Sequence, residues 1–261
     1  VPNEQMEFNL TANVSRMDQN GPGRHYIGGR WEAAEAFYIP NYSNRIHKNL
    51  AVDSGHSITD IFGTTFRAEY FAEDFTVTSL SSYREVEADI NNLVFGTDEL
   101  AALLVQSVPS PFGAILLAGT NPYVEDSETW TQEFRITSAG DGRLQWVAGL
   151  YYMHEETRRN ERGVIGVVTA NGVGGVITLV PVTDGGADTT NETDSYAVFG
   201  QLSYAITEDL GITVGARQTW EEKEVDTIAT ASALNPAGGY TVSLGDDYDA
   251  LTPTISVDWQ V

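Results

Sequence analysis

Cysteine is absent from this sequence of 261 residues, and basic residues are scarce. Without cysteine, neither a disulfide framework nor a thiolate metal site can form. The 14 lysines and arginines stand against 37 acidic residues, and the net charge of -23 argues against a nucleic-acid partner, which rewards clusters of basic side chains. We therefore expect a strongly solvated surface, or loops suited to cations and cationic ligands.

Long apolar runs are also missing. No window approaches the roughly 20 apolar residues that a transmembrane helix needs. The first residues, VPNEQMEFNL, have neither the basic start nor the apolar run of a signal peptide. With 41% hydrophobic residues and a mean hydropathy of -0.21, composition alone predicts a soluble globular protein.

Apolar residues instead recur at every second position, which is the period of a β-strand. The stretch TWTQEFRITSAGDGRLQWVAGLYYMHEE shows this most clearly, because its apolar residues lie mainly at even numbers and its odd positions are mostly polar. The same alternation predicts eight strands along the chain: Met6–Arg16, Ile61–Tyr70, Phe75–Glu85, two within Thr129–Glu156, Ser195–Ile206, Leu210–Glu221 and Ala250–Val261.

The connections between these strands alternate strictly in length. The short ones are Phe71–Asp74, Ala139–Gly142 and Thr207–Asp209. The long ones are Met17–Ser57, Glu87–Glu128, Thr157–Thr193 and Val225–Tyr248. In an up-and-down array, this alternation places every long connection at one end of the sheet and every short turn at the other.

Alternation also occurs in a half-buried soluble sheet, so a β-sandwich or a small closed barrel with an apolar core is an alternative. Strand length argues against a soluble sheet: several segments alternate over ten or more residues, where soluble strands typically have about five or six and tilted transmembrane strands about 9–11. The face opposite the apolar residues also carries charged residues, which a water-filled barrel lumen accepts. They include Arg67, Glu69, Glu133, Arg135 and Arg217.

Aromatic residues give a third argument, because they gather near the ends of the predicted strands, on the apolar face. Transmembrane barrels have aromatic girdles at these positions, one at each membrane interface. The residues are Tyr70, Tyr83, Trp130, Tyr152, Tyr196, Tyr204, Trp220 and Trp259. The separation of the two faces is imperfect, since Val147, Tyr151 and Phe199 fall on the polar side.

Several of these strands resemble the barrel of TonB-dependent outer-membrane receptors. The stretch from Thr129 to Glu156 is similar to a family hairpin in which T-Q-E-(F/L)-R-(I/L)-x-S leads through a tight turn into W-V-x-G-(L/V)-(Y/F)-Y. FTVTSLSSYR, DSYAVFGQLSYAITEDLGITVGARQTWEEKEVD and LTPTISVDWQV resemble other strands of the family. The resemblance covers about two thirds of the chain, and the order and spacing of these elements carry it.

The resemblance implies an all-β, antiparallel up-and-down transmembrane barrel, of which residues 1–261 are an incomplete slice of about eight strands. A complete receptor of this family has roughly 22 strands and a plugged lumen. Neither a plug domain nor an energy-coupling motif is evident here, and DWQV lacks the usual terminal aromatic residue. We therefore expect this slice to aggregate in isolation, through the unpaired edges of its first and last strands.

The resemblance also implies a function. Such receptors bind a scarce nutrient outside the cell, often a ferric siderophore, and import it with energy from the TonB complex, which acts on a region before the plug. The partners expected are therefore outer-membrane lipid, an extracellular nutrient and the TonB complex, in a Gram-negative bacterium. The alternatives are a passive porin-like barrel and a soluble β-sandwich binding module.

Candidate site residues are few. Arg24, Tyr26, Arg30 and Trp31, in the first long connection, are candidates for contacts with an anionic or aromatic ligand, and packing on the barrel rim is the alternative. The four histidines, His25, His47, His56 and His154, match no metal-ligand spacing, so we predict solvated loop or rim residues, no metal site and no cofactor. Acidic pairs such as Glu155–Glu156 and Glu221–Glu222 are expected on a charged rim, and we predict no enzymatic activity.

Overall fold

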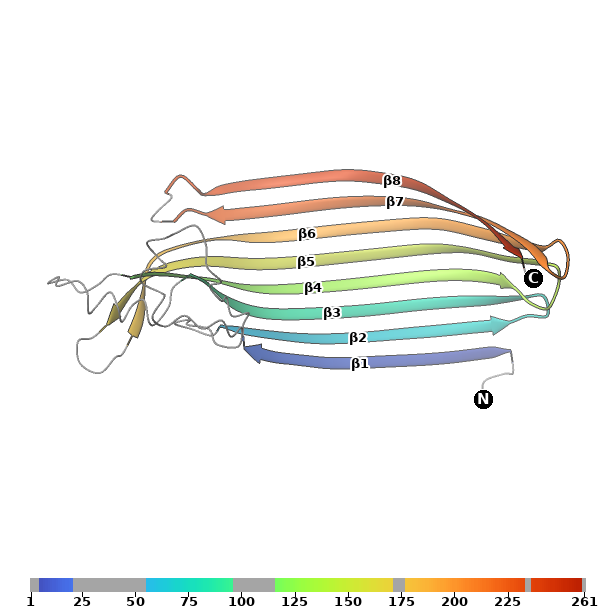
Figure 1. Ribbon diagram of the computed structural model, residues 1–261, viewed down its shortest axis with the longest axis horizontal. Helices are drawn as coiled ribbons and strands as arrows, with labels where there is room; N and C mark the ends of the chain where they lie inside the picture. The colour runs from blue at the N-terminus through green and yellow to red at the C-terminus, as the bar shows by residue number, and fades with distance from the viewer. Residues whose placement is uncertain (1–4, 21–54, 96–115, 171–176, 233–235, 260–261) are drawn as a thin grey trace.

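The computed structural model describes residues 5–20, 55–95, 116–170, 177–232 and 236–259. They form one antiparallel sheet in which each strand lies beside its neighbour in the chain (Figure 1). The strands are β1 (Met6–Asn20), β2 (His56–Phe71), β3 (Phe75–Phe95), β4 (Leu116–Ser138), β5 (Leu144–Ala170), β6 (Ile177–Ala205), β7 (Leu210–Thr230) and β8 (Tyr240–Trp259). The eight predicted strands and their up-and-down order are confirmed.

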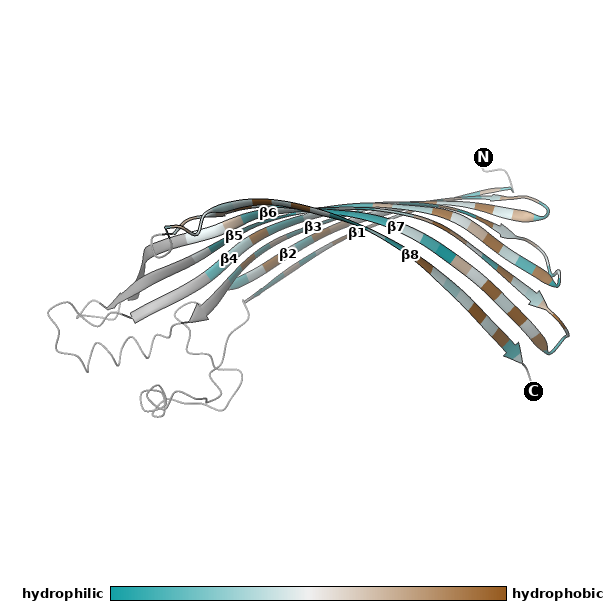
Figure 2. Cartoon of the chain, turned by 90° about the horizontal axis from the view of Figure 1, so that it is seen from above, coloured by the Kyte–Doolittle hydropathy of each residue, from teal (hydrophilic) through white to brown (hydrophobic). Residues whose placement is uncertain are grey.

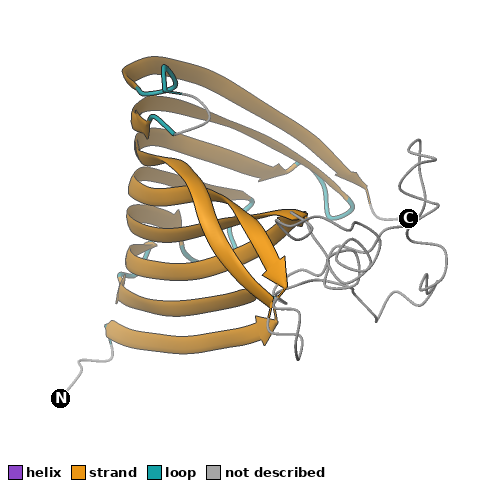
Figure 3. Cartoon of the chain, turned by 90° about the vertical axis from the view of Figure 1, so that its left-hand side faces the viewer, coloured by secondary structure: helices purple, strands orange, loops and turns teal. Residues whose placement is uncertain are grey.

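The sheet is curved and open (Figure 3). Among the described residues, β1 pairs only with β2 and β8 only with β7, so the strands do not close into a small barrel. There is also no second sheet packed on the first, as a β-sandwich requires. In the part of the chain described here, no helix has the length and apolarity to cross a membrane.

The three short connections lie at one end of the sheet (Figure 1). Their backbone groups close tight turns: the Ala72 amide donates to the Phe75 carbonyl at 2.9 Å, and the Ile206 amide donates to the Leu210 carbonyl at 2.8 Å. Gly140, in the turn between β4 and β5, has a φ of 85°, a conformation that costs glycine little and other residues more. The predicted positions of the short turns are thereby confirmed.

The strands are longer than the sequence predicted, with lengths from 15 to 29 residues. The connection predicted at Thr157–Thr193 was wrong in its bounds, because β5 continues to Ala170 and β6 begins at Ile177. Likewise β3 reaches Phe95, β4 begins at Leu116, β7 reaches Thr230 and β8 begins at Tyr240. In β5 and β6 the extensions next to the predicted strands, residues 157–163 and 185–193, are polar on nearly all positions of both faces, so they show no period-2 alternation.

A hydrophobic core is nearly absent from the described part of the sheet. The only buried hydrophobic residues there are Ala88 and Ala197, whereas large apolar residues are exposed on nearly every strand. A soluble domain of this size would bury most of these side chains. The apolar surface therefore needs an environment other than water.

Candidate functional site

The strand register gathers the apolar residues on one face of the sheet, which we call the outer face. Leu150 of β5 pairs with Val198 of β6, and their exposed fractions are 58% and 44%. Ala197, which points to the other face, is only 4% exposed. Side chains spread apart on the convex side of a curved sheet and crowd on the concave side, so the apolar face is the convex one. Figure 2 shows its hydrophobic positions recurring along the strands toward the short turns.

Aromatic residues bound this apolar face at two levels. The upper row is continuous: the Trp130 and Tyr152 ring centroids are 5.6 Å apart, and those of Tyr152 and Tyr196 are 4.9 Å apart. Tyr83 pairs with Trp130, and Trp220 with Tyr196, so both belong to this row. The lower row, near the short turns, contains Tyr70, Trp146, Tyr204 and Trp259.

The spacing of the two rows matches a membrane. On β6 they are eight residues apart, from Tyr196 to Tyr204, which corresponds to about 27 Å along the strand at ~3.3 Å per residue. A tilt of ~40° reduces this to about 20 Å, close to the ~25 Å apolar band of outer-membrane barrels. We call the surface between the rows the apolar band.

Beyond the upper row the outer face becomes acidic. Asp194 follows the Tyr152–Tyr196 level, and it accepts hydrogen bonds from the Tyr152 hydroxyl at 2.8 Å and from His154 at 3.1 Å. Asp194 is paired in register with Glu222, and Glu222 with Asp247. On β3 and β4 the Glu85–Glu128 pair lies two residues beyond Tyr83 and Trp130. The abrupt change from aromatic to acidic residues marks the limit of the apolar band.

The inner face of the apolar band is polar and charged. Arg67 and Glu69 of β2 form an ion pair at 2.6 Å, and the Thr78 hydroxyl donates to Glu69 at 3.1 Å. On β4, Arg135 and Glu133 lie 3.6 Å apart. Charged side chains at this depth are tolerated where they face a water-filled interior and pair with one another.

Two aromatic residues break the polar pattern of the inner face, and the structure explains both. The ring of Phe199 covers Gly149 on the adjacent strand, because a Cβ added to Gly149 would lie 2.3 Å from Phe199 Cζ. The guanidinium of Arg217 lies 5.1 Å from the Tyr151 ring centroid and 5.9 Å from that of Phe199. These rings therefore shield a glycine and support a cation.

Above the apolar band, the inner face carries a cluster of charged and aromatic residues on β4 and β5. Arg159 lies over the Tyr123 ring at 4.0 Å and forms ion pairs with Glu161 at 3.1 Å and Glu125 at 3.7 Å. The Asn121 amide donates to Glu161 at 2.7 Å. This cluster brings an aromatic ring, a guanidinium, an amide and two carboxylates together on the inner face.

A second polar group on the inner face lies on β7 and β8, also outside the apolar band. Lys223 binds Glu221 at 3.1 Å and is paired in register with Asp246. A hydrogen bond to Asp246 raises the pKa of the Tyr248 phenol above its usual value. Because the single hydroxyl proton of Tyr248 is donated to Asp246, its phenol oxygen remains available as an acceptor.

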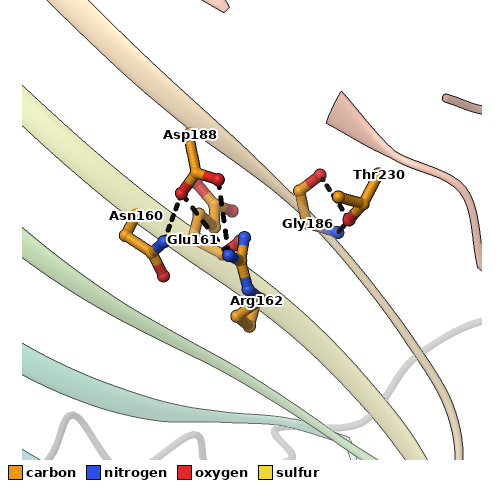
Figure 4. Close-up of polar contacts among 6 residues, drawn as sticks. All are labelled: Asn160, Glu161, Arg162, Gly186, Asp188 and Thr230. Carbon is orange, nitrogen blue, oxygen red and sulfur yellow. Dashed lines mark hydrogen bonds and ion pairs between the residues drawn. The ribbon is translucent and has the colours of Figure 1, made fainter. Parts of the chain in front are cut away.

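On the outer face of the extensions, polar contacts join β5, β6 and β7 (Figure 4). Asp188 of β6 accepts hydrogen bonds from Asn160 and from Arg162, the latter at 3.4 Å. Nearby, the Gly186 amide donates to the Thr230 hydroxyl at 3.1 Å. These contacts link neighbouring strands beyond the upper aromatic row.

The candidate ligand residues Arg24, Tyr26, Arg30 and Trp31 lie outside the described residues, as do His25 and His47. The prediction that His56 lies in a loop was wrong, because His56 is the first residue of β2. Its Nε2 lies 3.0 Å from Oδ1 of Asp89. Within the described ranges, no group of three His, Cys, Asp or Glu residues could hold a metal ion. The Tyr123–Arg159 cluster was missed because both residues fell in predicted connections, and only the strand register brings them together.

Comparison with known proteins identifies the family. The family model described as "TonB dependent receptor-like, beta-barrel" matches residues 5–261. The chain belongs to the TonB-dependent receptor family. A search of curated protein sequences found no match to it.

Solved structures with this fold include TonB-dependent siderophore receptors. The ferric yersiniabactin uptake receptor FyuA from Yersinia pestis has a TM-score of 0.61 at 15% identity, over 100% of this chain and 33% of its own. The ferric-catecholate import receptor Fiu from E. coli K12, in its closed form, has a TM-score of 0.59 at 17% identity, over 98% of this chain and 38% of its own. The siderophore receptor PiuA from Acinetobacter baumannii has a TM-score of 0.58 at 16% identity, with the same coverage as Fiu.

At these identities the likeness to solved structures extends to the fold alone. The chain spans between 33% and 38% of the length of these three proteins. The open sheet is therefore part of a TonB-dependent receptor barrel, and its outer apolar band is the surface that such a barrel turns toward lipid.

Proposed function

We propose that this chain forms part of a receptor for energy-coupled uptake of a scarce nutrient, such as a ferric siderophore, in the outer membrane of a Gram-negative bacterium. The observation that supports this most directly is the apolar band between two aromatic rows, with paired charges on the face behind it. Lipid would cover the band, and water would fill the lumen beside Arg67, Glu69, Glu133 and Arg135.

The ligand would enter from the extended end of the sheet. The Tyr123–Arg159 cluster and the Tyr248–Lys223 group on the inner face offer stacking surface and hydrogen-bonding groups there. The candidates from the first long connection, Arg24, Tyr26, Arg30 and Trp31, would add cationic and aromatic contacts at the same end, because β1 leads into that connection away from the short turns.

Energy coupling would come from the TonB complex, acting on a region of the receptor outside this chain. The family and fold are those of transport receptors and not of enzymes. The inner face supports the same interpretation, because the carboxylates of Glu69, Glu133 and Glu161 lie in ion pairs with arginine.

A passive porin-like barrel is the alternative that shares this architecture, and energy dependence distinguishes the two. A strain lacking the full-length gene would be grown under iron limitation with individual ferric siderophores, with the gene restored in TonB-positive and TonB-deficient backgrounds. We expect growth to be rescued only where TonB is present. Equal rescue of growth in both backgrounds would contradict the receptor proposal and support a passive channel.

A soluble β-sandwich module gains no support from the structure, since its apolar residues would require a second layer that the described residues do not form. Detergent extraction tests this point on the full-length protein. We expect it in the membrane fraction until detergent is added, and recovery from the soluble fraction would contradict the proposal.

A further inference from the structure

Three cations lie on the inner face of the apolar band in the described strands: Arg67, Arg135 and Arg217. Two of them have a carboxylate two residues away on the same strand, Glu69 for Arg67 and Glu133 for Arg135. Arg217 has no carboxylate at either of these positions. Its own strand offers Gly215 and Thr219 at the equivalent positions, and no described carboxylate lies within ion-pair distance of it.

The guanidinium of Arg217 is nevertheless held in place. Its Nε donates to the Thr219 hydroxyl at 3.1 Å, and the rings of Tyr151 and Phe199 lie 5.1 and 5.9 Å from its Cζ. These contacts use one donor and the π-face of the group. The four N–H bonds of the two terminal amino groups have no partner among the described residues, and they form the edge of the guanidinium that suits a planar anion.

The depth of Arg217 in the barrel indicates what the unpaired amino groups bind. Ala216, beside Arg217, is on the outer face between Val214 and Gln218, in the middle of the apolar band, so Arg217 projects into the lumen at bilayer depth. Ionisable residues at this depth normally pair with an opposite charge. A guanidinium fixed by aromatic rings is pre-organised for two parallel hydrogen bonds to a carboxylate.

We propose that the terminal amino groups of Arg217 bind a carboxylate in the lumen of the complete barrel. This inference rests on the proposed function, because it requires a lumen. The carboxylate has two sources with the same chemistry: an acidic side chain from a part of the protein outside this chain, or a free carboxylate that passes through the barrel.

Arg84 provides a matched control. It also lies on the inner face without a carboxylate partner among the described residues, but it is exposed and adjoins Tyr83 at the upper aromatic row. Water can solvate Arg84 there, so removal of its charge should leave the barrel unchanged.

The test uses the purified full-length receptor in detergent, with variants Arg217→Gln, Arg217→Lys and Arg84→Gln. Thermal unfolding midpoints would be measured without additive and during a titration with citrate, the probe for a free carboxylate. With a protein carboxylate, Arg217→Gln lowers the midpoint by several degrees without citrate. Arg217→Lys, which keeps the charge and loses the planar fork, lowers it less, and Arg84→Gln does not change it.

With a free carboxylate, the midpoint of Arg217→Gln equals that of the parent without citrate. Citrate then raises the parent's midpoint saturably, and Arg217→Gln loses this rise while Arg84→Gln keeps it. If Arg217→Gln matches the parent both without citrate and throughout the titration, the proposal is overturned.

These outcomes are separable from those of the growth test. If the protein rescues growth through TonB but shows neither Arg217 response, the carboxylate site is contradicted and the proposed function is retained. A protein that shows an Arg217 response without TonB-dependent growth would keep the site and lose that function.

Discussion

The ring of Phe199 on β6 occupies the space above Gly149 on β5. A Cβ added to Gly149 would lie 2.3 Å from Phe199 Cζ and 2.8 Å from the carbonyl oxygen of Phe134. The first contact could relax by rotation of the ring, but the second involves backbone held in the sheet. Glycine is therefore required at this position by close packing, since its φ is not in the left-handed region.

The first prediction follows from this contact. In the full-length receptor, Gly149→Ala should lower the free energy of unfolding by about 1–3 kcal/mol, the usual cost of overpacking. Gly200→Ala is the matched control, because a Cβ there would approach only the Val147 carbonyl oxygen, at 3.6 Å. Denaturant unfolding in lipid vesicles measures both, and equal midpoints for the two variants would contradict the prediction.

The strand Leu144–Tyr152 could be predicted from sequence because its two faces meet different environments. Leu150 lies on the apolar outer face and its neighbours lie on the polar inner face, so hydropathy alternates. At Arg159 and Asn160 the same strand lies beyond the upper aromatic row, and polar residues occupy both faces. The alternation vanishes there although the hydrogen-bonded ladder to β6 continues, which explains why this strand was predicted too short.

The Tyr123–Arg159 cluster could not be predicted from the sequence. Tyr123 and Arg159 are 36 positions apart in the sequence, and only the β4–β5 register places them together. A single tyrosine and a single arginine in polar segments form no sequence motif that would indicate a contact between them. Tyr151 and Phe199 looked like exceptions to the polar face for the same reason, since their roles beside Gly149 and Arg217 depend on neighbouring strands.

The second prediction tests which face meets lipid. Val214 lies on the outer face of β7, and Gln201 lies at nearly the same depth on the inner face of β6. Val214→Arg should destabilise the full-length receptor in lipid by about 1–3 kcal/mol, because Val214 lies about halfway between the middle of the apolar band and its lower aromatic row, and the cost of a cation falls from the midplane to the interface. Gln201→Arg, which would face water, should change stability by less than about 1 kcal/mol.

Unfolding of both variants in vesicles provides the measurement. If the inner-face variant proves the more destabilised, the assignment of the two faces is reversed. If neither variant is affected, the apolar band does not face lipid.

The third prediction compares the two ion pairs of the inner face. Glu69 has only 10% of its side chain exposed and binds both Arg67 and Thr78, whereas Glu133 is 24% exposed and lies 3.6 Å from its arginine. Both arginine side chains are well exposed to solvent, which limits the coupling energy of either pair. A double-mutant cycle with Arg67→Met and Glu69→Gln should give a coupling energy of about 1 kcal/mol.

The cycle for Arg135→Met and Glu133→Gln serves as the comparison, and it should give about 0.3 kcal/mol. Both cycles use denaturant unfolding of the full-length receptor. A larger coupling for the β4 pair would show that solvation, and not the shorter distance and the additional hydrogen bond, decides the strength of these pairs.

The last prediction concerns the extensions beyond the membrane. Asp188 links β6 to Asn160 and Arg162 of β5, where no lipid supports the strands. Asp188→Ala removes both contacts, so backbone amides of residues 160–163 and 185–188 should exchange hydrogen about fivefold faster, which corresponds to ~1 kcal/mol of local opening. Asp188→Asn keeps an acceptor for Asn160 and should raise the exchange rate less.

Because local opening leaves the segments between the aromatic rows intact, the global unfolding midpoint of Asp188→Ala should not change. A lowered midpoint without faster local exchange would mean that Asp188 supports the whole barrel and not these extensions.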